Sequence, residues 1–421
     1  MNYKELPQEE LKLLYENCKQ RYDELKAKGL KLDMSRGKPG ADQLDISVGL
    51  MSALSHDDYL AEDGTDCRNY GGIDGIPEMK RLFAELFEVK EEEILVGGNA
   101  SLTLMYESLC ANFMVEKNKN SKIPNRKFLC PSPGYDRHFT ITEYLGMEMI
   151  TIPMTPTGPD IAEVKKHIAD PAVAGIWCVP VYSNPEGVVY SDEVIRELAA
   201  LKPAADDFRI LWDNAYMLHP FEGEAPKVAN LLKECEKSGN YDMPLMYMSF
   251  SKITFPGAGI CAMAASPSNL KKMREHLIVH TIGPDKLNQL RHMRYFKDAS
   301  GVRSHMKKHA AVLKPKFETV LNALSANLEG KGIGEWLKPS GGYFIAFDTL
   351  PGCAKRTIAL CAEAGLVMTS AGATYPHGKD PEDKNIRIAP TFPNILQLEQ
   401  AMALFCIAVE LASLEKLNEK N

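Results

Sequence analysis

The sequence predicts an α/β protein that has a large domain, built on a mostly parallel sheet between helices, and a smaller α+β domain. Three observations lead to this prediction. The 421 residues are more than one small core requires. Between residues 94 and 265, short apolar runs alternate with amphipathic stretches, which is typical of parallel strands covered by helices on both faces. After residue 266 the pattern becomes helical and then strand-like again.

We expect the chain to divide into three segments. Residues 1–45 form an N-terminal helix and a segment that contributes to the small domain. Residues 46–300 form the large domain, and residues 301–421 form the C-terminal small domain. No internal repeat and no linker rich in serine and glycine separates these segments, so the domains should pack closely.

The individual elements can be assigned in chain order. An amphipathic helix that ends at Gly29 places six side chains on one face: Leu11, Leu14, Tyr15, Cys18, Tyr22 and Leu25. Seven strand-like runs follow: ILVGG, KFLCPSPG, MEMITIPM, AGIWCVPV, RILWDNAY, PLMYMSF and GICAMAAS. The small domain then has a long helix around residues 303–329, strand-like runs at GGYFIAFD, LVMTS and NIRIAP, and a closing helix from Ile395.

Composition excludes several classes of protein. A net charge of −7 and a pI near 5.9 give no basic surface for nucleic acid, so no nucleic-acid partner is expected. The first 30 residues lack the basic-then-apolar order of a signal peptide, and no membrane span is expected. Ten scattered cysteines without a CxxC pair are typical of reduced, buried thiols. We therefore expect a cytoplasmic protein without a membrane partner.

Polar residues that follow the apolar runs are the candidates for chemistry, because ligands of open α/β sheets bind beyond the carboxyl ends of the strands. The run MYMSF leads to Lys252, where burial and nearby cations would lower the pKa of the amine toward a usable nucleophile. The run RILW ends at Asp213, with Tyr216 three residues further on, and IWCVPV leads to Asn184 in the turn SNPEG. After ILV, residues 97–101 open a helix whose free N–H groups favour an anion.

Each of these features has an ordinary explanation when it stands alone. A lysine at a strand end is usually a solvated charge, and an aspartate there is usually a turn or capping residue. Asn-Pro-x-Gly is a common turn, and Gly-Gly-Asn is another. Their occurrence in one order, together with Ser-x-Ser-Lys, instead indicates the chemistry of pyridoxal 5'-phosphate (PLP). That cofactor requires a lysine, an acid for its pyridinium nitrogen and a phosphate site.

Over nearly its whole length the sequence resembles the fold-type I PLP-dependent aminotransferases, and among them the subgroup 1c aspartate aminotransferases. The resemblance lies between SRGKP and NIRIAP, in RNYGGIDGIPEMK, GGNASLTLM, PSPGYDRHF, SNPEG, DNAY, SFSK and Arg387. It implies the PLP-dependent transferase fold of type I, PLP as cofactor and a homodimer. It also implies a ping-pong aminotransferase that moves the amino group of an L-amino acid, with L-aspartate expected, to 2-oxoglutarate.

The resemblance also implies roles for single residues. Lys252 matches the lysine that forms the Schiff base and moves a proton between Cα and C4′, and Asp213 matches the acid that keeps the pyridine nitrogen protonated. Tyr216 and Asn184 match the pair that hydrogen-bonds the phenolic oxygen. The other implied cofactor contacts are the stacking residue Tyr135, a phosphate cup at Asn99, Ala100, Ser101 and Ser249, and Tyr70 of the neighbouring subunit. The implied substrate contacts are Arg387, which suits a carboxylate as a bidentate donor, with Asn184 and Gly37.

Two features depart from the family pattern. Position 260 is isoleucine, whereas the pattern has a phosphate-binding arginine eight residues after the lysine; Arg68 is one candidate replacement. The residue that would read a second substrate carboxylate cannot be assigned, and the stretch TIGPDKLNQLRHMRYF offers three candidates: Lys286, Gln289 and Arg291.

Other functions remain open at this point. An aminotransferase for another amino acid, or a PLP lyase or decarboxylase on the same fold, would keep Lys252, Asp213 and Arg387. A PLP-sensing regulator would carry a basic helix-turn-helix domain ahead of SRGKP, where only about 35 residues stand. A dinucleotide-binding oxidoreductase is disfavoured, because the sequence has no G-x-G-x-x-G motif opening a βαβ unit. His138 and His219 lack further ligands at metal-site spacing, so no metal site is expected.

Overall fold

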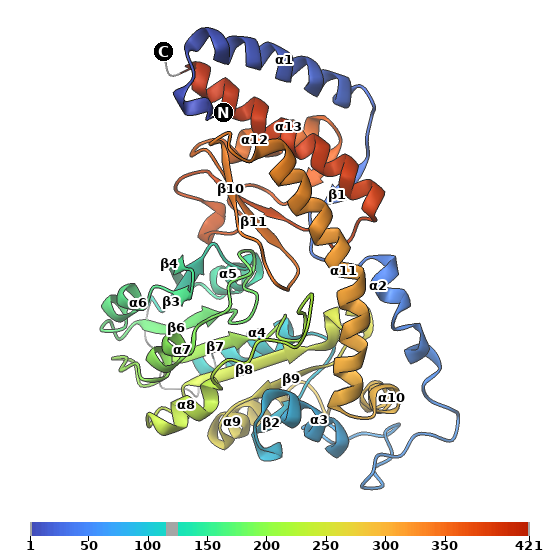
Figure 1. The fold of residues 1–421 in the computed structure, drawn as a ribbon. Coiled ribbons are helices and arrows are strands. Elements are labelled where there is room, and N and C mark those ends of the chain that lie inside the picture. Colours follow the sequence, from blue (N-terminus) through green and yellow to red (C-terminus); the bar gives the residue numbers. More distant parts are fainter. Residues whose placement is uncertain (1, 115–124, 420–421) are drawn as a thin grey trace.

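The computed structural model describes residues 2–114 and 125–419. Figure 1 shows the large sheet at one end of the molecule and the two chain termini together at the other, with the long helix α11 running between these parts. The three segments predicted from the sequence also include residues 1, 115–124 and 420–421, which lie outside the described residues.

An eight-stranded sheet forms the centre of the larger part, in the order β2-β9-β8-β7-β6-β3-β4-β5. Neighbouring strands from β8 to β4 are parallel, whereas β9 is antiparallel to both its neighbours and β5 is antiparallel to β4. The predicted mostly parallel sheet is therefore confirmed. The strands are β2 Ile94–Val96, β3 Lys127–Ser132, β4 Glu148–Thr155, β5 Gly158–Pro159, β6 Val173–Cys178, β7 Arg209–Asp213, β8 Pro244–Ser249 and β9 Cys261–Ala264.

Helices cover both faces of this sheet. Successive residues of a strand point to opposite faces, so Ile210 and Trp212 of β7 pack in one apolar layer and Leu211 packs in the other. The first layer includes side chains of α3, α6, α7, α8 and α10, and the second includes α4, α5 and α9. These helices are α3 Pro77–Phe87, α4 Ser101–Leu109, α5 Asp136–Tyr144, α6 Ile161–His167, α7 Asp192–Ala199, α8 Leu231–Lys237, α9 Pro267–Leu277 and α10 Lys286–Phe296.

The smaller part has its own core, which joins side chains from residues 3–34 with side chains from residues 317–414. It contains an antiparallel sheet β10-β11-β13 and a parallel pair β1-β12. The bounds are β1 Leu32–Met34, β10 Gly334–Trp336, β11 Ile345–Thr349, β12 Leu366–Met368, β13 Asn385–Ile388 and α12 Ala354–Glu363. This shared core supports the division that we propose, in which residues 1–45 join the small domain.

Several element bounds differ from the sequence prediction. The strands β1, β5 and β10 were not predicted, because their sequences LDM, GP and GEW contain no run of apolar residues. Helix α11, Ala299–Leu328, begins earlier than expected since the Asp298 side chain accepts a hydrogen bond from the Gly301 amide at 2.9 Å and caps it. The N-terminal helix α1 spans Gln8–Lys26, and the short helix α2 spans Ala41–Asp45.

The closing helix predicted from Ile395 is α13, Ile395–Glu419, and it is strongly apolar. By length and composition it could cross a membrane, with a mean hydropathy of 1.6, but 67% of that stretch is buried inside the protein. Side chains of α1, α11 and α12 pack in the same core as α13 (Figure 1). Its apolar surface is therefore explained by its place at the centre of the small domain.

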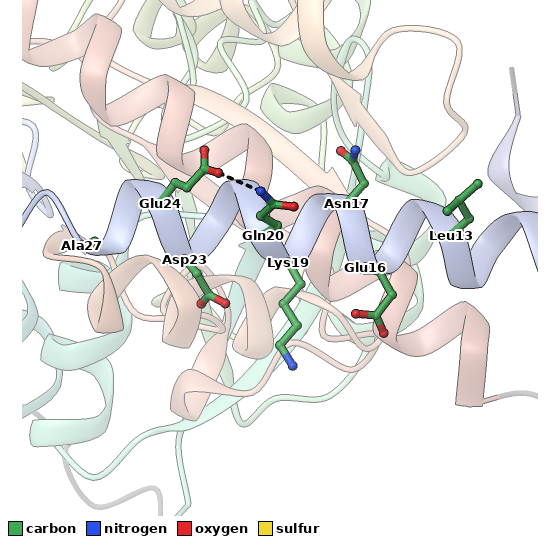
Figure 2. Close-up of a pocket in the computed structure, with 8 residues that line it drawn as sticks. All are labelled: Leu13, Glu16, Asn17, Lys19, Gln20, Asp23, Glu24 and Ala27. Atoms are coloured by element: carbon green, nitrogen blue, oxygen red, sulfur yellow. Dashed lines mark hydrogen bonds between the residues drawn. The ribbon is translucent and has the colours of Figure 1, made fainter.

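Helix α1 buries one face and exposes the other. Leu11, Cys18 and Tyr22 of the predicted apolar face are buried, and the Tyr22 hydroxyl donates to the Leu360 carbonyl at 2.8 Å. Figure 2 shows a hollow along the outer face of α1, where the Gln20 amide donates to Glu24 at 3.1 Å. Because all eight lining residues belong to this one helix, the hollow cannot enclose a ligand, and we assign it no function.

Candidate active site

Most of the predicted site residues meet at one edge of the large sheet. Parallel strands end at a common edge, so Asp213 at the end of β7 and Ser249 at the end of β8 lie beside the turn that follows β6. A separate apolar cluster occupies this edge and joins Tyr182 and Tyr216 of the large domain to Tyr343 and Phe344 of the small domain. The site therefore lies between the two cores, where the strand ends face the small domain.

Lys252 follows β8 in the short 3-10 turn Phe250–Lys252. Its Nζ atom lies 4.8 Å from the ring centroid of Tyr216 and 5.9 Å from that of Tyr343. Burial lowers the pKa of this amine, which the charge of Arg387 lowers further and that of Asp213 raises. A lysine in this environment is neutral at lower pH than a surface lysine, as a nucleophile or base requires.

Asp213 is 3% exposed and has one paired and one unpaired carboxylate oxygen. Its Oδ2 atom lies 3.2 Å from Nε2 of His138, and its Oδ1 atom is buried without a partner among the described residues. The His138 ring stacks on Trp177 at 4.2 Å, which fixes the imidazole. A buried carboxylate oxygen without a donor is costly, so this oxygen fits the N–H group of a protonated heterocycle.

Tyr216 and Tyr135 lie close enough to Asp213 and Arg387 to interact with their charges, and Asn184 contacts Arg387. The buried Tyr216 ring stacks on Tyr343 with centroids 5.7 Å apart, and burial raises the pKa of its hydroxyl. Tyr135 meets His138 edge to face at 5.0 Å, and burial raises its pKa to about 12. The Nδ2 group of Asn184 is buried and has no partner among the residues that the structure describes. Three phenol or amide groups thus remain able to donate to a ligand.

A polar cup lies where α4 begins. The Ser249 and Ser251 hydroxyls are 2.5 Å apart, and Ser251 also donates to the Asn99 carbonyl at 2.9 Å. A Cβ atom at Gly259 would lie 3.0 Å from that carbonyl and 3.1 Å from the Ser251 amide, so glycine leaves this backbone accessible. Ala100 is the N-cap residue of α4, and the first turn of the helix, from Ser101, adds backbone N–H groups that have no acceptor inside the helix. The cup has the donors that an anion requires.

The missing arginine leaves this cup short of positive charge. Ile260 is 1% exposed and packs in the apolar core. Arg68, the candidate replacement, forms an ion pair with Asp66 at 2.7 Å and lies over the Tyr59 ring at 3.5 Å. Within one chain Arg68 is therefore occupied elsewhere.

Arg387 on β13 is 6% exposed and points into the same site. Its NH1 group donates to Asp136 at 2.8 Å and to Oδ1 of Asn184 at 3.3 Å, while its Nε atom has no partner within the described part of the chain. The guanidinium lies 4.9 Å from the ring centroid of Phe344. A Cβ atom at Gly37 would lie 2.3 Å from that same ring, so glycine is required where the N-terminal segment passes Phe344. Sequence reasoning missed Asp136, which follows β3 as the first residue of α5, because nothing in its own segment indicates a contact with Arg387. It missed Phe344 because that residue belongs to the small domain and does not end a strand of the large sheet.

Tyr70 lies apart from these groups and is 83% exposed. Its turn is held by Lys286, whose Nζ atom donates to the carbonyls of Asn69 at 2.7 Å and Gly71 at 2.6 Å. Gln289 accepts a hydrogen bond from the Ile76 amide at 2.9 Å. Lys286 and Gln289, two of the three candidates for binding a second substrate carboxylate, thus already bind backbone groups. Arg291 donates to Asn288 and keeps a buried Nε atom without a partner in the described residues.

Possible metal ligands do not gather at this site. Among residues 2–114 and 125–419, one group of three is close enough to hold an ion: Glu107, His276 and His280. It lies on α9, on the turn after α9 and on the end of α4 opposite Ser101, and a 2.7 Å contact between His276 and Glu107 explains it as an ion pair. His138 and His219 belong to no such group in that part of the chain.

The fold and this site define a fold-type I aminotransferase. The structure of an aspartate transaminase from Corynebacterium glutamicum superposes with a TM-score of 0.96 at 43% identity and covers 99% of both chains. An α-aminoadipate aminotransferase from Thermus thermophilus, complexed with N-(5'-phosphopyridoxyl)-L-leucine, shares the fold at a TM-score of 0.75 and 18% identity, covering 92% of this chain and 93% of that one.

The sequence comparisons identify the family. The family described as aspartate amino-transferase matches residues 6–421. The aspartate aminotransferase of Corynebacterium glutamicum is 44% identical over 97% of this chain and 95% of its own length. A putative aminotransferase of Mycolicibacterium smegmatis is 45% identical over 99% of both. The chain belongs to the aspartate aminotransferase family and is an aminotransferase.

Proposed function

We propose that the protein transfers the amino group of L-aspartate to 2-oxoglutarate by a ping-pong reaction with PLP as cofactor. The unpaired, buried Oδ1 atom of Asp213 carries this proposal, because a buried carboxylate oxygen without a donor would accept a hydrogen bond from a protonated pyridine nitrogen. When bound, PLP supplies an electron-accepting ring that stabilises negative charge on the substrate Cα. The 44% identical aspartate aminotransferase supports the choice of aspartate.

The residues would divide the remaining work. The lowered pKa of Lys252 would allow its Nζ atom to accept the Cα proton and then to donate it to C4′. Asp213 keeps the ring nitrogen protonated, with His138 holding its second oxygen. Asn184 and Tyr216 would bind the phenolic oxygen, Tyr135 would lie against the ring, and the cup at Asn99, Ala100, Ser101 and Ser249 would bind the phosphate. Arg387 would bind the α-carboxylate beside Gly37 and Asn184.

Absorbance titration of the purified holoenzyme tests this function. L-Aspartate should convert the long-wavelength band of the aldehyde form of PLP into the shorter-wavelength band of the amine form, and 2-oxoglutarate should restore the first band. A band that ignores aspartate but responds to another amino acid would contradict the proposed substrate. Loss of carbon dioxide or of a side-chain fragment, without the amine form, would favour a decarboxylase or lyase. Absence of any band after reconstitution would contradict PLP.

We propose that the active enzyme is a homodimer in which Tyr70 serves the neighbouring subunit. Tyr70 is 83% exposed. The apolar residues Ile278, Val279 and Ile282 are also more than half exposed. The two segments adjoin, since a Cβ atom at Gly283 would lie 2.7 Å from the Gly71 carbonyl. An exposed apolar surface of this kind favours association. Light scattering on the protein used for the titration should give about twice 46.8 kDa; a monomer that completes the spectral cycle would contradict the dimer.

We place the enzyme in the cytoplasm. All ten cysteines are free, and nine of them are buried. This arrangement supports a reducing compartment, where thiols do not form disulfides.

Asp136 should weaken substrate binding, and Asp136→Asn should lower KM. In the structure Asp136 occupies NH1 of Arg387 at 2.8 Å, so the substrate carboxylate must compete with it. A partly exposed ion pair is worth up to about 1 kcal/mol, so we expect KM for L-aspartate to fall by about 3- to 5-fold with kcat nearly unchanged. Steady-state kinetics measure this, with Asp57→Asn at an exposed position as control. An increase in KM would show instead that Asp136 orients Arg387 for binding.

A further inference from the structure

The turn that carries Lys252 is held through its carbonyl groups by side chains from outside the turn. Nε2 of His219 lies 3.2 Å from the Lys252 carbonyl oxygen, and the Tyr343 hydroxyl donates to the same oxygen at 3.5 Å. Nε2 of His305 lies 2.9 Å from the carbonyl oxygen of Ile253, to which the Ser47 hydroxyl also donates at 3.3 Å. Two consecutive carbonyl groups are therefore each bound by one histidine and one hydroxyl.

The hydrogen bonds define the protonation of both histidines. A carbonyl oxygen only accepts, so Nε2 of His219 and Nε2 of His305 must carry the hydrogen. His219 is 2% exposed and its Nδ1 atom is buried without a partner among the described residues, so this ring is neutral. Burial, and then the neighbouring His309, lower the pKa of His219 to about 3, and burial also lowers the pKa of His305. Both side chains are fixed neutral donors around neutral pH.

These two donors come from elements that are far apart in the sequence. His219 belongs to the loop after β7, the same segment that places Asp213 and Tyr216. His305 lies on α11, which connects the large sheet with the small domain in Figure 1. The turn at Lys252 and Ile253 is therefore bound both to the segment that would contact the cofactor and to the helix that leads to the small domain.

We propose that His219 and His305 are positioning residues that fix the carbonyl groups of Lys252 and Ile253, and thereby hold the Lys252 Nζ atom over the Tyr216 ring. The proposal rests on the proposed role of Lys252. The same nitrogen must hold the cofactor and later reach the substrate Cα proton, so its backbone must not rotate between these tasks. A misplacement of 1 Å can reduce a rate by about 100-fold.

Paired substitutions separate positioning from simple stability. His219→Leu and His305→Leu remove the donor, whereas His219→Gln and His305→Gln keep an amide N–H at nearly the position of Nε2. Holoenzymes should be compared by single-turnover rate with L-aspartate, by the pH at which the bound PLP absorbance changes, and by thermal unfolding. We expect each leucine variant to lose about 10- to 100-fold in rate and to shift the pH of the absorbance change. The glutamine variants should recover most of both properties.

Several outcomes would overturn the proposal. Leucine variants with wild-type rate and absorbance profile would show that the two histidines do not position Lys252. Equal loss in leucine and glutamine variants, in parallel with lower thermal stability and an unchanged absorbance profile, would show a purely structural role. If a leucine variant does not fold, the glutamine variant at that position and the pair at the other still decide the question. His56→Leu, at a position with a 90% exposed side chain, serves as control. Wild-type protein without PLP absorbance would instead contradict the proposed function itself.

Discussion

Replacing Lys252 by alanine is expected to reduce transamination by at least about 10⁴-fold, because the substitution removes both the covalent anchor of the cofactor and the base for the Cα proton. Within the residues that the structure describes, the Lys252 ammonium is the cation found over the Tyr216 ring, so no neighbouring lysine can take its place. The measurement is the rate at which L-aspartate converts reconstituted holoenzyme to its amine form in one turnover.

Two controls make the result for Lys252 specific. Lys237→Ala removes a lysine whose side chain is 69% exposed and should leave the rate unchanged. Lys252→Arg keeps a positive charge but cannot release its proton near neutral pH, and should be as inactive as the alanine variant. A Lys252→Ala protein that still converts aspartate within tenfold of the wild-type rate would show that another group moves the proton.

Replacing Asp213 by asparagine is expected to reduce kcat by about 10²- to 10³-fold, the usual effect of removing one preorganised electrostatic partner. Asparagine preserves the volume and one oxygen, but it lacks the negative charge that would keep a pyridine nitrogen protonated. The change also leaves Nε2 of His138 beside a neutral amide in a buried site, where Oδ2 of Asp213 now lies at 3.2 Å. Single-turnover rates and the affinity for PLP should be measured together.

The Asp213 experiment has a matched comparison in Asp207, another buried aspartate that pairs with Arg126 at 2.7 Å, away from this site. Asp207→Asn should lower the unfolding temperature, because it leaves a buried guanidinium with a neutral partner, yet it should spare the rate per folded molecule. If Asp213→Asn loses stability but keeps its rate, then Asp213 is a structural residue and the unpaired Oδ1 atom does not bind the cofactor.

Much of the site could be predicted because it is built from strand ends. Each strand of the parallel sheet is a short apolar run, and the polar residue that ends the run must face the edge where ligands bind. Lys252, Asp213 and Asn184 were identified in this way, and the structure places all three at that edge. Roles tied to the cofactor remain proposals that the experiments above test.

The contacts that tune these residues could not be predicted. Trp177 fixes His138, Asp136 occupies Arg387, and His305 binds the turn after Lys252, and each contact joins parts of the chain that are distant in sequence. None of these three residues belongs to a motif that signals its partner. The sequence likewise does not indicate which helices cover the apolar surface of α13, and the structure shows that α1, α11 and α12 share its core.

By itself, the sequence determined the order of the elements, the mostly parallel sheet and the residues at its reactive edge, because hydrophobic periodicity and strand-end chemistry are local properties of the chain. Only the tertiary structure decided which oxygen of Asp213 is left unpaired, which acid competes for Arg387 and which donors hold the lysine turn. The physical reason is that hydrogen bonding and burial in this site depend on side chains brought together from β7, β8, α11 and β13, and their relative placement is fixed only when both cores have packed.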